Sequence, residues 1–586
     1  MKKIVSLILV LALVMGVVGC SQETSKDVKL DGTYEGIGSG KGGNIVVDLT
    51  IADNKISKIE VKESHETEGL SEAMNIMTNN MIATNSLGVD SVSGATLTSA
   101  GFRMAVKNAF EKTGADESAL ISTGKVEMEK RESEYTADVI VIGAGGAGMT
   151  AAITAADNGA SAIVLEKMPI QGGNTLLSGG EYAAPENWVQ VEEKLEDSND
   201  LFYGDILKGG DNENDPALAR VLADNALDGA NWLKDYIDVR FEDYQLFFGG
   251  HSVKRSLVPI NATGFEMINK LTEKLNEKEI PLHKNTTATE LIQDKDGKVI
   301  GVKATYGDQE ITYKANKGVI LTTGGFGSNL DMRVKYNQNM GEKILSTNSV
   351  GSTGDGITMV EKIGAQLVDM EYIQTYPTCD TQSGTLLYVG DVRMEGRSIL
   401  VNKEGSRFVE ELERRDVISK AVTEQTGGVS YMFWDESAMV DSKVAIKHET
   451  EYNNLIARKQ LVKADTIEEA AKFFEIDAAE LKKTIDNYNQ YAKDGKDLEF
   501  NKRGELVPFG EGPYYIMVSK PAVHHTMGGV KINTNAQVIN TNGEIIKGLF
   551  AAGEVTGDIH GTNRLGSDAI ADITVFGRIA GQSAAK

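Results

Sequence analysis

The feature that most constrains this chain is an apolar strand pattern that runs directly into a glycine-rich turn. Residues 138–148 read Asp-Val-Ile-Val-Ile-Gly-Ala-Gly-Gly-Ala-Gly, and an alanine-rich helical pattern follows over residues 149–158. In this spacing Gly143 permits the tight turn, Gly145 lets the backbone approach a pyrophosphate, and Gly148 allows close packing of helix on strand. The N-terminus of the helix then faces the negative phosphates. The pattern predicts a dinucleotide-binding α/β domain.

A second strand pattern over residues 161–165 ends at Glu166, where an acidic residue is suited to bind ribose hydroxyls. Apolar strand segments and helical segments then alternate, which indicates an α/β, Rossmann-like domain. Residues 373–516 carry fewer glycine landmarks, and we expect an inserted α+β capping domain there. Within this insertion Asp477 and Glu480 form a capping-box pattern, which predicts the start of a helix.

Composition narrows the functional class. The net charge of −25 argues against a general affinity for nucleic acid or anionic lipid. The chain has two cysteines, too few for a disulfide framework or a cysteine-ligated cluster. We predict no metal site, and no oligomeric state is predicted.

The N-terminus resembles an export signal. Two lysines precede an apolar run over residues 4–18, which is shorter than the roughly 20 residues of a membrane span. The run ends in Val-Val-Gly followed by Cys20, which resembles a bacterial lipobox. We therefore expect export and a lipid anchor on Cys20, at the outer face of the cytoplasmic membrane or the periplasmic side of an envelope membrane. The alternative is ordinary signal cleavage beside an incidental cysteine.

Three further glycine-rich stretches, at residues 172–180, 323–326 and 553–557, resemble the FAD-binding landmarks of the fumarate reductase/succinate dehydrogenase flavoprotein family. The resemblance extends from about residue 138 to the C-terminus and implies non-covalent FAD. Because a second dinucleotide fingerprint is absent, direct NADH binding is not expected. The implied FAD-binding residues are Gly143, Gly145, Gly146, Gly148, Glu166, Lys167, Gly173, Asn174, Thr175, Ser178, Gly179, Gly180, Thr323, Gly324, Gly325, His525, Glu554, Ala569 and Ile570.

Two motifs resemble the part of this family that binds a substrate carboxylate. Residues 524–529 read His-His-Thr-Met-Gly-Gly, and residues 561–566 read Gly-Thr-Asn-Arg-Leu-Gly. The resemblance implies that His524 and Arg564 bind the carboxylate. This fits chemistry, because a planar guanidinium binds a carboxylate through two parallel hydrogen bonds.

The run Arg414-Arg415-Asp416 resembles the segment that supplies the family's catalytic arginine. By resemblance, Arg415 protonates one alkene carbon while N5 of FAD delivers hydride to the other. An arginine pKa normally lies above about 12, so this role rests on the resemblance alone. The alternative is that Arg415 only polarises the substrate or pairs with Asp416.

The chain departs from fumarate reductases at the far end of the substrate. Tyr376 replaces a histidine, and Asp391 stands where the family has the glutamate of a Thr-Glu pair. Asp391 would relay protons to Arg415, and Arg393 would replace the second arginine of the relay, whose own position is Met394. A buried, unpaired second carboxylate would cost several kcal/mol, so fumarate is expected to be a poor substrate.

Tyr376 and Asp391 suit a flat ring that carries an N–H group. A tyrosine packs on such a ring, and a carboxylate accepts its N–H. The pair resembles that of urocanate reductases, which implies reduction of urocanate to dihydrourocanate (imidazole propionate). Fumarate, cinnamate and other enoates remain alternatives, although cinnamate offers Asp391 no N–H group.

The N-terminal module resembles FMN-binding domains in which a threonine is esterified to FMN phosphate. Residues 90–98 read Asp-Ser-Val-Ser-Gly-Ala-Thr-Leu-Thr, and Thr96 is the expected acceptor, with Thr98 as the weaker alternative. This implies an FMN transferase for maturation and a quinol-linked or flavin-linked electron donor at the membrane or outside the cell. We expect strands at residues 45–51 and 56–61, and helices at 70–81 and 102–110.

These interpretations divide the chain into seven segments. They are a lipoprotein signal peptide (1–19), a lipid-anchored tether (20–31), an FMN-binding domain (32–113), a linker (114–135), the first part of an FAD-binding domain (136–372), the capping domain (373–516) and the second part of the FAD-binding domain (517–586). Two other functions remain open. One is an extracellular electron-carrier lipoprotein without a dedicated substrate, and the other is an oxidase that uses oxygen.

Overall fold

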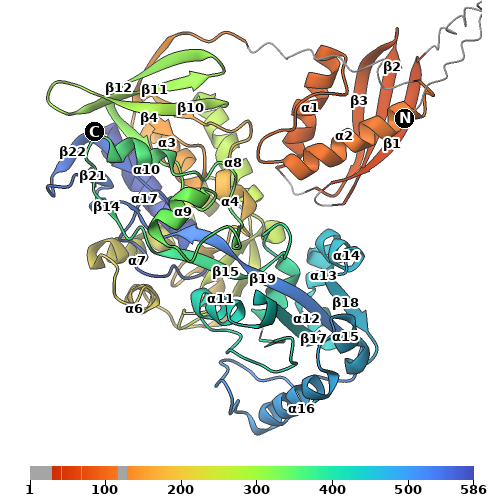
Figure 1. The fold of residues 1–586 in the computed structure, drawn as a ribbon. Helices are drawn as coiled ribbons and strands as arrows, with labels where there is room; N and C mark the ends of the chain where they lie inside the picture. Colours follow the sequence, from red (N-terminus) through yellow and green to blue (C-terminus); the bar gives the residue numbers. More distant parts are fainter. Residues whose placement is uncertain (1–29, 41–42, 67–68, 116–128, 395) are drawn as a thin grey trace, which may run out of the picture.

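The computed structural model describes residues 30–40, 43–66, 69–115, 129–394 and 396–586. The predicted signal peptide, Cys20 and most of the linker lie outside these residues. Figure 1 shows a small N-terminal unit beside a much larger α/β unit. Within the described ranges, no helix combines the length and apolar character needed to cross a membrane.

The N-terminal unit is a three-stranded antiparallel sheet covered by two helices. Its elements are β1 (Gly32–Ser39), β2 (Asn44–Ala52), β3 (Lys55–Ser64), α1 (Ser71–Thr84) and α2 (Thr96–Glu111). The two predicted strands are confirmed, and both helices extend further than predicted. Strand β1 was not predicted, because three glycines lower its strand propensity. The packing explains one of them: a Cβ atom on Gly36 would lie 2.1 Å from the carbonyl oxygen of Ala105 in α2.

The larger unit is built on an eight-stranded sheet whose parallel centre carries the dinucleotide motif. Strands β12 (Gln309–Leu321), β4 (Glu134–Ile142) and β5 (Ala162–Leu165) are neighbours and run parallel. Helix α3 (Gly146–Asp157) follows β4, as the alternation predicts. The other strands of this sheet are β9 (Leu282–His283), β10 (Thr286–Gln293), β11 (Val299–Tyr306), β21 (Gln537–Ile539) and β22 (Ile545–Ala551). This arrangement confirms the predicted α/β class.

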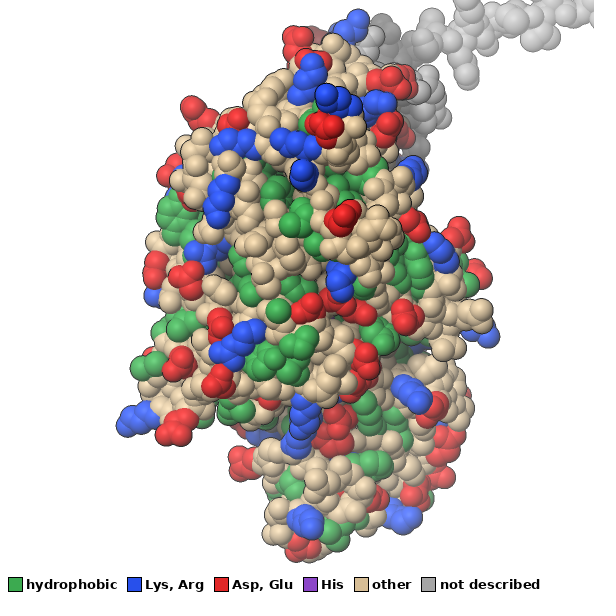
Figure 2. All heavy atoms as spheres, turned by 90° about the vertical axis from the view of Figure 1, so that its left-hand side faces the viewer, with side chains coloured by type: hydrophobic (Ala, Val, Ile, Leu, Met, Phe, Trp, Pro, Cys, Tyr) green, Lys and Arg blue, Asp and Glu red, His purple; other side chains and the backbone are tan. Residues whose placement is uncertain are grey.

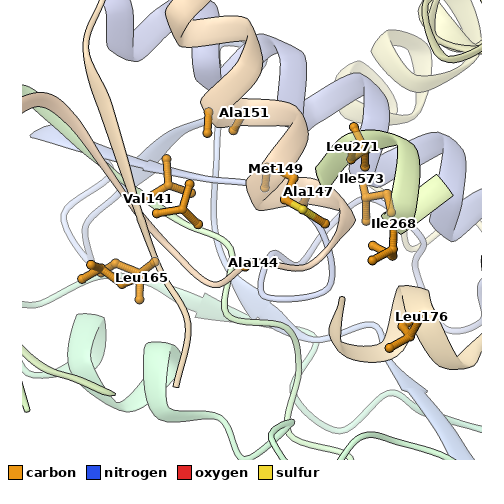
Figure 3. Close-up of a cluster of buried hydrophobic side chains, with 14 of the residues drawn as sticks. Val141, Ala144, Ala147, Met149, Ala151, Leu165, Leu176, Ile268, Leu271 and Ile573 are labelled. Carbon is orange, nitrogen blue, oxygen red and sulfur yellow. The ribbon is translucent and has the colours of Figure 1, made fainter. Parts of the chain in front are cut away.

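The core around this motif is apolar and close-packed. Figure 3 shows Val141 and Leu165 from the sheet, Met149 from α3, and Ile573 from α17 (Asp568–Ala585) within one buried cluster. Gly148 permits a close approach, because a Cβ atom there would lie 1.9 Å from the carbonyl oxygen of Gly143. The cluster therefore fixes the turn between β4 and α3.

A second sheet of six strands is organised around β19 (Tyr514–Thr526). The first half of β19 pairs with β17 (Ser430–Asp435) and β18 (Leu461–Ala464), and its second half pairs with β15 (Ile373–Cys379). The predicted boundary at residue 516 therefore lies inside a continuous strand. The remaining strands are β6 (Tyr182–Ala183), β7 (Phe241–Leu246), β8 (Ser256–Pro259), β13 (Leu345–Ser346), β14 (Leu367–Val368), β16 (Ile399–Val401) and β20 (Gly529–Val530).

Helix α16 (Ala478–Asp494) begins where predicted, and the Asp477 carboxylate accepts from the N–H groups of Ala479 and Glu480. The Glu480 carboxylate instead contacts Lys483 at 3.1 Å, so only half of the predicted capping box forms. The other α-helices are α4 (Gly173–Leu177), α5 (Trp188–Glu193), α6 (Asn199–Gly209), α7 (Pro216–Asn231), α8 (Gly264–Glu277), α9 (Leu330–Tyr336), α10 (Asp355–Glu361), α11 (Arg415–Thr423), α12 (Glu436–Ser442), α13 (Val444–Lys447), α14 (Glu449–Ala457) and α15 (Ile467–Phe473).

The surface carries both signs of charge. Figure 2 shows basic and acidic side chains interspersed over one face of the molecule, with apolar side chains between them. No single-sign stripe is visible on that face, so nothing there indicates electrostatic steering of a polyanion.

Candidate active site

One continuous cavity collects the predicted cofactor and substrate residues. It is lined by the β4–α3 turn, the ends of β5 and β12, and residues of α4, β15, α11, β19 and α17. All predicted FAD residues line it except Gly148, Gly180 and Gly325, and all predicted substrate residues line it. Elements far apart in sequence thus meet around a single space.

The three excepted glycines shape the walls of the cavity. A Cβ atom on Gly180 would lie 2.9 Å from the backbone of Gly264, and one on Gly325 would lie 2.5 Å from the Glu554 carboxylate. Gly148 is buried under the β4–α3 turn, as described above. The close contacts at these positions require glycine.

The dinucleotide end of the cavity fits FAD. Gly145 precedes α3 without a side-chain cap, and the N–H of Gly146 makes only a long contact of 3.4 Å to the Thr175 hydroxyl, so the start of the helix is suited to bind phosphate. The Glu166 carboxylate accepts from the N–H groups of Ala144 at 2.9 Å and Met168 at 2.8 Å, and burial raises its pKa. Lys167 binds Asp355 at 2.5 Å at the same end.

The middle of the cavity is held by Glu554. Its carboxylate accepts from the N–H of Thr526 at 3.1 Å and from the side-chain amide of Asn174 at 2.9 Å. Burial raises the pKa of Glu554. The contact joins α4, β19 and the segment after β22, and so fixes three walls of the cavity.

At the substrate end, Arg564 and His524 are both held by protein groups. The Arg564 guanidinium donates to the side-chain oxygen of Gln374 and to the carbonyl of Leu565, both at 2.9 Å. Its Nε atom has no partner among the described residues. Burial and the charge of Arg415 lower the pKa of Arg564 to about 9.

His524 faces the same space as a neutral ring. Its Nδ1 atom lies 2.9 Å from the hydroxyl of Thr347, and burial followed by the charge of Arg564 lowers its pKa well below the usual value. The centre of its ring lies 5.3 Å from that of Tyr376. The two predicted substrate residues are therefore in contact.

Arg415 stands at the first turn of α11 above aromatic rings. The central carbon of its guanidinium lies 4.9 Å from the ring centre of Tyr376 and 5.2 Å from that of Phe248. The predicted alternative of a pair with Asp416 is wrong, because the Asp416 carboxylate binds Arg414 at 2.7 and 3.1 Å. Within the described part of the chain Arg415 has no hydrogen-bonding partner, and burial lowers its pKa.

Asp391 lines the cavity, whereas Arg393 does not. Burial raises the pKa of Asp391 well above its usual value, and the nearby carboxylate of Glu181 adds to the rise. The Arg393 guanidinium donates to the carbonyl of Glu411 at 2.6 Å, although its charge opposes the rise at Asp391. A relay through Arg393 therefore stays a prediction.

The residues of the cavity wall that the sequence did not reveal include Glu181, Tyr388 and Phe248. Burial raises the pKa of Glu181, while the charges of Arg415 and Arg564 oppose the rise. Its signal in the sequence is an acidic residue directly after a Ser-Gly-Gly landmark and before an apolar run. Tyr388 and Phe248 follow no motif, and only the fold brings them to the site.

The N-terminal unit distinguishes the two candidate threonines. Thr96 is exposed at the first residue of α2. Thr98 is only 1% exposed, and its hydroxyl donates to Glu66. An exposed hydroxyl at a helix start fits an acceptor of FMN better than a buried, bonded one.

The loop before Thr96 adjoins the large cavity. Ser93 and Gly94 line a second, smaller cavity together with Met168, Gly173 and Ser349. The last three residues also line the large cavity. The loop before Thr96 therefore packs beside residues that also line the large cavity.

Comparison with known proteins agrees with this geometry. The family described as "FAD binding domain" matches residues 138–570, and that described as "FMN-binding domain" matches residues 40–111. The chain belongs to the fumarate reductase/succinate dehydrogenase flavoprotein family. It is an FAD-dependent oxidoreductase with an added FMN-binding domain.

Individual relatives cover most of this flavoprotein. It is 48% identical over 556 residues to the urocanate reductase of Eggerthella lenta. This alignment covers 94% of this chain and 92% of that protein. It is 37% identical over 487 residues to a fumarate reductase (cytochrome) of Shewanella frigidimarina. This alignment covers 81% of this chain and 82% of that protein. A solved flavocytochrome c3 fumarate reductase in an open conformation is 36% identical, with a TM-score of 0.64. The match covers 77% of this chain and 78% of that one.

Proposed function

We propose that this flavoprotein reduces the carbon–carbon double bond of urocanate to give imidazole propionate. The observation that carries the proposal is the meeting of Tyr376 and Asp391 with Arg415, His524 and Arg564 in one cavity. The similarity to a urocanate reductase over nearly the whole chain supports the same substrate.

Different residues bind the two ends of the substrate. Arg564 and the neutral His524 bind the carboxylate as hydrogen-bond donors. Tyr376 packs against the imidazole ring at the other end. Bound FAD would supply hydride to one alkene carbon, and Arg415 donates the proton to the other.

Asp391 and Glu181 are proposed to share one proton. The charge of Glu181 adds to the raised pKa of Asp391, and two carboxylates buried close together resist double ionisation. The protonated member returns a proton to Arg415 after turnover, and the ionised member accepts the ring N–H. An acrylate without a ring nitrogen would leave the ionised carboxylate without an N–H donor.

Fumarate and cinnamate fit this site less well. The second carboxylate of fumarate would face Asp391 and Glu181 rather than a cation, which costs several kcal/mol when buried. Cinnamate would pack on Tyr376 but would leave both carboxylates without an N–H donor. Either compound would therefore be a weaker substrate.

The proposal is tested by anaerobic oxidation of a reduced viologen dye by the protein loaded with flavins. Urocanate, cinnamate and fumarate are compared at equal concentration. Fast turnover of urocanate alone supports the proposal, and fast turnover of fumarate overturns it. Turnover of none of the three favours another enoate or a carrier of electrons without its own substrate, and substrate-dependent peroxide in air favours an oxidase.

We also propose that electrons arrive from a membrane or extracellular donor, quinol-linked or flavin-linked, through FMN esterified to Thr96 by a transferase. The adjoining cavities beside Gly94 support a short path to FAD. The capping domain would close over the substrate and exclude water. The open conformation reported for a related flavocytochrome supports such a motion.

We propose export and lipid anchoring at Cys20, on the strength of the basic, apolar and small-residue pattern that precedes it. Metabolic labelling with a radioactive fatty acid tests this. Label should enter the native protein and be lost in Cys20→Ser. Equal labelling of both proteins, or of neither, would contradict the anchor.

A further inference from the structure

The turn between α6 and α7 is attached to the segment that carries Arg564. The carbonyl of Gly210 accepts from the N–H of Thr562 at 3.2 Å, and the side-chain amide of Asn214 donates to the carbonyl of Ile559 at 2.9 Å. Asp211, at the tip of the turn, adopts a left-handed φ of 57°. Non-glycine residues adopt this conformation uncommonly, although aspartate does so more often than most, and here it lies in a turn held by these two hydrogen bonds.

From this turn Asp211 reaches the capping domain. Its carboxylate accepts from the Arg414 guanidinium at 2.6 and 3.1 Å, and from the Thr562 hydroxyl at 2.5 Å. Arg414 directly precedes Arg415, and Thr562 lies two residues before Arg564. One carboxylate therefore joins the two backbone segments that carry the arginines of the active site.

The Arg414 guanidinium is held from its other side as well. It donates to the Asp416 carboxylate in the first turn of α11, and its side chain is only 18% exposed. A paired, fork-shaped contact of this kind fixes direction as well as distance. An ordinary surface ion pair contributes little, but this one links positions 203 residues apart in the chain.

We propose that Asp211 is a positioning residue that sets Arg415 opposite Arg564 by holding the capping domain on the FAD-binding domain. The inference rests on the proposed function, which gives both arginines their roles toward the substrate. Asp211 does not line the cavity and touches no reacting atom. Its loss should reduce the population of the arrangement that binds substrate, and apparent affinity falls by the same fraction.

The kinetic test compares Asp211→Asn with Asp211→Glu, which keeps the charge. We expect Asp211→Asn to raise KM roughly fivefold to tenfold with a smaller loss of kcat. Asp211→Glu should recover part of the loss. A merely misfolded fraction would instead lower kcat and leave KM unchanged. The matched control is Asp224→Asn, since Asp224 forms an exposed ion pair with Arg220 on α7 alone and should leave both constants unchanged.

A second readout does not depend on the substrate. Hydrogen exchange of the backbone amides of α11, without substrate, should be faster in Asp211→Asn than in the native protein. High salt should bring the native protein toward the variant, because screening weakens the partly exposed pair. If Asp211→Asn does not fold, Arg414→Lys removes the fork but keeps the charge and should show the same change to a smaller degree.

Unchanged exchange in α11 together with unchanged KM in a folded Asp211→Asn would overturn the inference, as would an equal effect of Asp224→Asn. These outcomes are distinct from failure of the proposed function. If the native protein reduces none of the three enoates, the exchange measurement still decides the role of Asp211.

Discussion

At the scale of single residues, the active site buries ionisable groups, and burial disfavours their charged forms. Asp391 is buried with a pKa well above its usual value. We predict that Asp391→Asn raises the free energy of unfolding by about 1 kcal/mol at neutral pH, because a strained functional site is relieved. Urea denaturation of the two proteins measures the difference.

The difference in the free energy of unfolding between the native protein and Asp391→Asn should depend on pH. Below the ordinary carboxyl pKa, Asp391 is protonated in both the folded and unfolded states, so the two proteins should differ little. As the pH rises, the unfolded state releases its proton first, and the native protein loses stability relative to the variant. A difference that is independent of pH, or a less stable variant, would contradict this account. Asp224→Asn, at an exposed position, is the control.

At the scale of elements, two helical glycines should respond in opposite ways to alanine. A Cβ atom on Gly148 in α3 would lie 1.9 Å from a backbone oxygen, whereas one on Gly204 in α6 would meet nothing within 4 Å. We expect Gly148→Ala to lose most of its FAD and about 2 kcal/mol of stability. Gly204→Ala should gain roughly 0.5 kcal/mol. Flavin absorbance and thermal unfolding measure both, and equal behaviour of the two variants would contradict the packing.

The start of α2 carries a second prediction at this scale. Thr96→Ala should abolish covalent FMN, whereas Thr98→Ala should keep it, because only Thr96 exposes its hydroxyl. Mass spectrometry of the purified chains detects the added FMN. Retention of FMN by Thr96→Ala would move the acceptor to another residue.

Elements were predictable where their signal was local. The strand–turn–helix at Gly143 and the Asp477 cap lie within short stretches of sequence, and both form. Strand β1 was missed because Gly36 is present for its close approach to α2, a contact between residues 69 positions apart. Strand propensity cannot anticipate such packing.

At the scale of the whole molecule, motifs predicted which residues meet but not what holds them. His524, Arg564 and Arg415 belong to recognisable runs, and the fold brings them to one cavity. Glu181 and Asp211 belong to no substrate motif, since their use arises only when distant segments assemble. Arg393 shows the converse, because proximity in sequence to Asp391 did not bring it into the cavity lining.

We propose that the Asp391 carboxylate selects a substrate by accepting the N–H of its ring. The most direct measurement is the ratio of kcat/KM for urocanate to that for cinnamate, in the native protein and in Asp391→Asn. We predict a native ratio well above one that falls by about 100-fold in the variant, mainly through loss of urocanate turnover. An unchanged ratio, including one that results from equal losses of kcat/KM on both substrates, would show that Asp391 does not bind the ring N–H.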